Sequence, residues 1–96
     1  MDATIKAEIL AQSRIAHAHT EAAYRDHPSK RGSAEWPEKQ RILLADMALH
    51  LLQTSLREGE LEIDDLKRNL FAILTISDEL LPGRGLKQVA DDLYGP

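Results

Sequence analysis

The hydrophobic positions between Ile42 and Leu56 repeat at helical spacing and predict one long helix in the middle of the chain. At about 100° per residue they form a continuous apolar arc of about 220°. Its members are Ile42, Leu44, Ala45, Met47, Ala48, Leu49, Leu51, Leu52 and Leu56. The narrow polar stripe that remains holds Lys39, Asp46, His50, Gln53 and Arg57. One neighbouring helix cannot cover so wide an arc, so we expect this helix to be the buried centre of a helical bundle.

The N-terminal segment predicts a second helix, from about Ala3 to Tyr24 or Arg25. Asp2 precedes it and can cap its first turn, because a carboxylate accepts hydrogen bonds from free backbone N–H groups. We expect a weak apolar face to turn toward the core, made of Ile5, Ile9, Ile15, Ala16, Ala22 and Ala23. We expect the opposite face to be solvated, and it carries Lys6, Ser13, Arg14, His17 and Glu21.

Turn-forming residues separate the remaining helices. Residues 26–36 contain Pro28, Gly32 and Ser33 and predict a loop. The central helix is then expected from Pro37, in its first turn, to Glu58, and Gly59 ends it.

A third helix is predicted from about Asp64 to Leu81, with Asp64 as its cap, although a new segment can also begin within residues 77–81. Its apolar face excludes Phe71. A short fourth helix, Leu86 to Tyr94, completes the series.

The predicted fold is a single all-α domain over residues 1–96. It is an antiparallel bundle of three long helices and one short C-terminal helix. One valine and four aromatic residues are few for a sandwich or barrel. Because the short fourth helix leaves part of the central helix uncovered, we expect a homodimer formed through the central helix.

Charge and cysteine content limit the function classes. The formal net charge is −4, and opposite charges alternate, which argues against a dedicated nucleic-acid binder. Lys30, Arg31 and Arg84 are the basic residues that such binding would use. Residues 86–93 resemble the first helix of a helix-turn-helix motif, but we favour a capping helix. With no cysteine, no secretory signal and no membrane-spanning run, we expect a cytoplasmic protein.

Two pairs of residues offer metal-binding or acid–base chemistry. His17 and Glu21, and likewise Asp46 and His50, are four residues apart, so each pair shares a helix face. If the two faces met, they would supply two nitrogens and two carboxylates for a metal ion. The spacing differs from the Glu-x-x-His of di-iron bundles. We therefore favour a surface pair and a groove pair, and we predict no cofactor.

The polar stripe of the central helix is the other candidate site. Its default interpretation is a solvated seam, and the alternative is a partner-binding surface formed by Asp46, His50, Gln53, Arg57 and the separate aromatic Phe71. No serine lies in a G-x-S-x-G pattern, and Pro82-Gly83-Arg84-Gly85 lacks the residues of a phosphate loop. The sequence therefore favours a small non-catalytic interaction or regulatory module, with a helical metal-binding protein or enzyme as the alternative.

Overall fold

The computed structural model describes residues 1–95, and Pro96 lies outside the described residues. Within the described residues, four helices follow one another: α1 (Ala3–Asp26), α2 (Trp36–Leu56), α3 (Ile63–Leu80) and α4 (Leu86–Asp92). This confirms the predicted fold class of three long helices and one short C-terminal helix.

The helix ends agree with the sequence in part. Asp2 caps α1, since its Oδ1 accepts from the backbone nitrogens of Thr4 at 2.7 Å and Ile5 at 3.2 Å. Helix α2 begins one residue before Pro37 and ends at Leu56, two residues earlier than predicted. Gly59, with a φ of +90°, then helps the chain reverse its direction.

The third helix differs from the prediction at its start. Glu62 is the N-cap residue of α3, and its side chain makes no capping hydrogen bond. Asp64 therefore lies inside the first turn, where a carboxylate is still favourable because the N-terminal end of a helix is electropositive. The helix continues unbroken through Ser77 to Leu80, so no new segment begins there.

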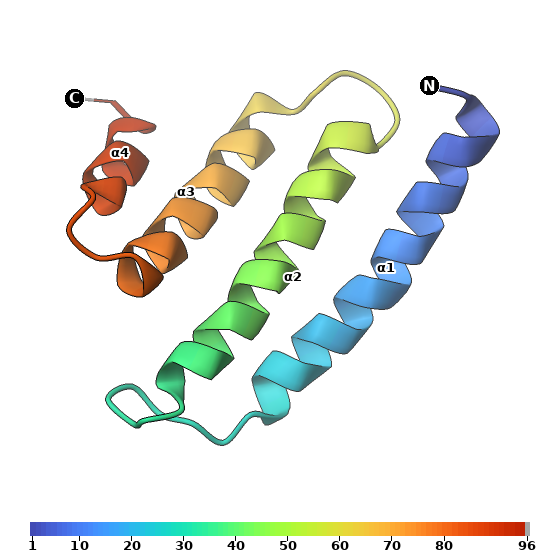
Figure 1. Ribbon diagram of the computed structural model, residues 1–96. Coiled ribbons are helices and arrows are strands. Elements are labelled where there is room, and N and C mark those ends of the chain that lie inside the picture. Colours follow the sequence, from blue (N-terminus) through green and yellow to red (C-terminus); the bar gives the residue numbers. More distant parts are fainter. Residues whose placement is uncertain (96) are drawn as a thin grey trace.

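The helices lie side by side in one layer, each antiparallel to the one before it (Figure 1). Within residues 1–95, each helix contacts only its neighbours in sequence: α1 contacts α2, α2 contacts α3, and α3 contacts α4. The layer measures 44 × 36 × 16 Å. Its smallest dimension, 16 Å, is less than two helix diameters of about 10–12 Å each, so the helices form a single layer. No second layer covers either side of α2 within the described chain.

Helix α1 packs on α2 through its polar face, so the predicted core face is wrong in part. Of its six residues, three are half-buried and three are exposed: Ile9, Ala16 and Ala22 are half-buried, and Ile5, Ile15 and Ala23 are exposed. Ser13 is only 4% exposed, whereas Ile5 and Ile15 are 52% and 63% exposed. The Ser13 hydroxyl donates to the Leu10 carbonyl of its own helix at 2.8 Å, which satisfies its hydrogen-bonding need locally. A small side chain satisfied in this way can be buried between two helices at little cost.

Helix α2 occupies the middle of the layer, but its apolar arc is not buried within the chain. Ala45 and Ala48 are exposed, and the leucines of the arc are half-buried. Asp46 and Thr54 are buried instead. Among residues 1–95, the buried hydrophobic residues are Ile76 and Ala90 alone.

The C-terminal segment partly covers Phe71 of α3. The Phe71 ring meets the Tyr94 ring edge to face at 5.5 Å, and Lys87 Nζ lies 4.3 Å from the Phe71 ring centre. In the part of the chain that the structure describes, none of the helices combines the length and the apolar character needed to cross a bilayer.

Candidate functional site

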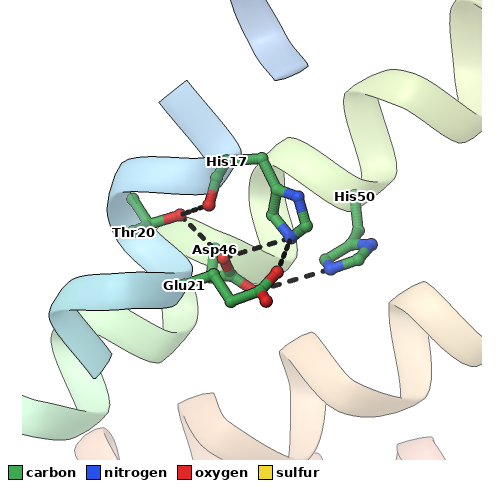
Figure 2. A network of polar contacts seen from close by, with 5 residues as sticks. All are labelled: His17, Thr20, Glu21, Asp46 and His50. Carbon is green, nitrogen blue, oxygen red and sulfur yellow. Dashed lines mark hydrogen bonds and ion pairs between the residues drawn. The ribbon is translucent and has the colours of Figure 1, made fainter. Parts of the chain in front are cut away.

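Two histidines and two carboxylates gather between α1 and α2 (Figure 2). Helix α1 contributes His17 and Glu21, and α2 contributes Asp46 and His50. His17 Nε2 lies 3.3 Å from Asp46 Oδ1 and 3.6 Å from Glu21 Oε2. His50 Nε2 lies 3.4 Å from Asp46 Oδ2. We call these four residues the His–carboxylate cluster.

Asp46 is the centre of the cluster and is 5% exposed. Thr20 Oγ1 donates a hydrogen bond to its Oδ1 at 2.7 Å (Figure 2). Among residues 1–95, no lysine or arginine nitrogen lies within 4.0 Å of the Asp46 carboxylate, and its ion-pair partners are His17 and His50. Those imidazoles carry charge only when protonated. A buried carboxylate with no permanent cation beside it is costly unless protons or a metal ion compensate it.

The two imidazole rings face the same space. Their centres are 4.2 Å apart and their planes are inclined by 75°. Despite its 3.3 Å distance from Asp46, the buried His17 Nε2 has no hydrogen-bond partner among residues 1–95. The ligand atoms of His17, Asp46 and His50 all lie within 4.8 Å of one another, close enough to hold one metal ion.

The structure therefore brings together all four residues that the sequence offered as metal-binding candidates. The sequence predicts a solvated face for His17, but that face packs on α2 and leaves the His17 side chain only 20% exposed. Sequence reasoning missed Thr20, which supports Asp46. The available signal was its spacing, because Thr20 lies three residues after His17 and so shares its helix face.

The rest of the polar stripe lies near α3. Gln53 and Arg57 line a polar pocket of about 270 Å³ that also contains Asp65, and Gln53 Nε2 is buried without a hydrogen-bond partner among the described residues. Arg57 donates to Asp65, and this hydrogen bond lowers the pKa of the Asp65 carboxyl below its ordinary 3.8 against the opposing effect of desolvation. The charges of Arg57 and Arg68 add to the lowering. His50 also lines this pocket, so it lies between the pocket and the His–carboxylate cluster.

The remaining candidates lie apart from this site. Phe71 packs against the C-terminal segment, as described above. Arg31 contacts Glu79 of α3 at 3.2 Å, and its guanidinium lies 5.4 Å from the Trp36 ring centre. Partner binding through the polar stripe and Phe71 stays a prediction.

Comparison with protein-family models, curated proteins and solved structures found no match to this chain. Its function is therefore inferred from its own residues and packing.

Proposed function

We propose that this protein is a small, non-catalytic helical interaction module that self-associates as a homodimer through α2. The observation that carries this proposal is the surface that the isolated layer exposes. Its accessible surface is 6579 Å². A compact folded monomer of its 10.8 kDa mass has about 5,500 Å². The single chain therefore exposes roughly 1,000 Å² more than a closed domain of its size.

The shape of the chain agrees with its surface. Its radius of gyration is 15.0 Å, whereas about 12.5 Å is typical of a compact domain of this length. A standard protein–protein interface buries about 800 Å² on each partner. One such interface would remove most of the excess surface.

We place the dimer contact on the outer side of α2, opposite the polar stripe. At its N-terminal end Arg41 and Ala45 also border α1, because they line an open pocket with Ala23 of that helix. Residues spaced by three and four positions form this outer stripe: Arg41, Ala45, Ala48, Leu52 and Ser55. All but Leu52 are exposed, and Leu52 is half-buried. The half-buried Leu44 and Leu51 flank the stripe and widen its apolar surface. Ala45, Ala48 and Leu52 belong to the predicted apolar arc, and no second layer of helices covers them within residues 1–95.

The lack of charge on this surface favours a second copy of the chain as its partner. In a two-fold symmetric dimer the same patch meets itself, so a charge at its centre would face its own copy. From Leu44 to Leu56 the outer stripe and its flanking leucines carry no charge. Arg41 lies at one end of the stripe, where it can remain at the rim of the contact.

Light scattering on a sizing column, over a series of concentrations, tests the proposal. The expected mass is about 22 kDa, twice the 10.8 kDa chain, with dissociation on dilution. A folded species of 10.8 kDa at every concentration would contradict self-association.

A further inference from the structure

We propose that His17, Asp46 and His50 bind one divalent transition-metal ion between α1 and α2, with Glu21 as the fourth ligand. The site lies within a single chain and on the polar side of α2. It therefore does not depend on the proposed dimer, and the two proposals can fail separately.

Some of the distances between ligand atoms are close to those of a tetrahedral site. Zinc binds imidazole nitrogen and carboxylate oxygen at about 2.0–2.1 Å, so two ligand atoms at the tetrahedral angle are about 3.3–3.4 Å apart. His17 Nε2 lies 3.3 Å from Oδ1 of Asp46, and His50 Nε2 lies 3.4 Å from Oδ2, so the two imidazoles approach different oxygens of this carboxylate. The three ligand atoms lie within 4.8 Å of one another, so the half-buried His50 has to move inward for all three to bind one ion. The His17–Glu21 contact, at 3.6 Å, needs only a small adjustment of the glutamate, which is 62% exposed.

The unpartnered nitrogen of His17 gives an independent reason for an ion. His17 Nε2 is buried, points toward Asp46 and makes no hydrogen bond within residues 1–95 (Figure 2). A buried polar atom without a partner is costly. A metal ion placed between this nitrogen and the carboxylate would satisfy both, and it would also compensate the buried charge of Asp46.

The donor atoms decide the class of metal. Two imidazoles and carboxylates suit zinc and other first-row transition ions, whereas calcium and magnesium are bound through oxygen ligands. Asp46 is oriented by the Thr20 hydroxyl, the kind of outer hydrogen bond that fixes a metal-binding carboxylate. The exposed Glu21 leaves the ion accessible from solvent on one side.

Zinc titration of tag-free protein, stripped with a chelator and then dialysed, tests this proposal by calorimetry. We expect one zinc ion per chain with a dissociation constant in the micromolar range or tighter. Loss of a residue that only hydrogen-bonds to a metal ligand weakens metal affinity about 10- to 100-fold. His17→Ala and His50→Gln each remove a direct ligand, so they should weaken zinc binding by about 100-fold or more. Glu21→Gln should have a smaller effect, because water can replace an exposed carboxylate.

His19→Ala is the matched control. His19 lies on the same helix but is exposed, and it is not part of the cluster. This variant should bind zinc like the wild type, and circular dichroism should show the same helix content for every variant. Cobalt gives a second readout, since a four-coordinate site with nitrogen ligands produces visible absorption bands that His50→Gln should remove.

Two results would overturn the metal site. One is the absence of saturable zinc binding below millimolar concentration in the folded wild-type protein. The other is equal weakening by His17→Ala and His19→Ala, which would indicate diffuse binding to surface histidines. In either case the cluster would be a polar contact that holds α1 against α2.

Discussion

Replacing Ala48 by glutamate distinguishes a monomer, in which this position is exposed, from the proposed dimer, in which it is buried. Ala48 is exposed in the single chain and lies at the middle of the outer stripe. In a monomer Ala48→Glu should be almost silent, because glutamate is a good helix former and costs only a few tenths of a kcal/mol relative to alanine. In the proposed dimer the same side chain would be buried against the second copy.

The expected loss of affinity is large because the substitution acts twice. An uncompensated buried charge costs about 3–5 kcal/mol, and each subunit would bury one. Two copies at the lower figure give about 6 kcal/mol, and every 1.4 kcal/mol changes a dissociation constant tenfold. The dimer of the Ala48→Glu variant should therefore dissociate at concentrations about 10⁴-fold higher than the wild type.

Sedimentation equilibrium over a wide concentration range measures this shift directly. The matched control is Ala11→Glu, the same change at an exposed position of α1. Ala11 lies about 200° around the helix from Ser13, which packs on α2, so it should not reach the dimer contact. Dimerisation of Ala48→Glu with wild-type affinity would refute the assignment of the contact to the outer stripe. An equal loss in both variants would point to a general effect of added charge.

Three further substitutions test contacts within the chain. Thr20→Val should lower the free energy of unfolding by about 1–3 kcal/mol in urea denaturation, because it removes the donor to a buried carboxylate, and Thr20→Ser should restore most of it. Arg57→Gln should lower the melting temperature at pH 7, and this loss should shrink as the pH falls below the ordinary value of 3.8 and through the lowered pKa of Asp65, since Arg57 stabilises the fold only while that carboxyl is ionised; a loss that is independent of pH would contradict this. Phe71→Ala should cost about 1–3 kcal/mol and speed amide exchange in α4, because it removes the ring that Tyr94 and Lys87 pack against, and unchanged exchange there would exclude this role.

The elements of this fold could be predicted because their signals are local. The Asp2 cap, the first-turn Pro37 and the turn at Gly59 that follows the end of α2 each depend on residues a few positions apart. The start of α3 could not be predicted in the same way, because the Glu62 side chain makes no capping hydrogen bond and so leaves no local signal, whereas Asp64 has the residue type of a cap but lies in the first turn. These signals fix the order and approximate length of the helices.

Burial was harder to predict because hydrophobic periodicity assumes that apolar side chains face the inside of the same chain. In α1 the buried position is Ser13, and Ile15 is exposed. In α2 Asp46 is buried and Ala48 is exposed. In both helices, therefore, a polar side chain is buried and an apolar one is exposed, the reverse of what hydrophobic periodicity predicts. Such a failure is expected if the missing apolar cover comes from outside the chain.

For the candidate site, the sequence predicts which residues share a helix face but not which two faces meet. Spacing correctly placed His17 with Glu21 and Asp46 with His50, since each pair is separated by one helical turn. It could not show that the two pairs face each other, because that depends on which face of α1 packs on α2. Ser13 and Thr20 lie in the contact with α2, and His17 shares their helix face because it lies four residues after Ser13 and three before Thr20.

The polar side of α2 lacks a permanent positive charge beside Asp46, and the outer side lacks apolar cover, within residues 1–95 of the single chain. On the polar side, Asp46 is buried beside an unpartnered His17 nitrogen and lacks a permanent cation within residues 1–95. On the other side, Ala45, Ala48 and Leu52 are apolar, and no second layer covers them within residues 1–95. A metal ion would supply the missing charge, and a second copy of the chain would supply the missing cover. Because the two faces of the helix are separate, Ala48→Glu should abolish the dimer and leave zinc binding intact.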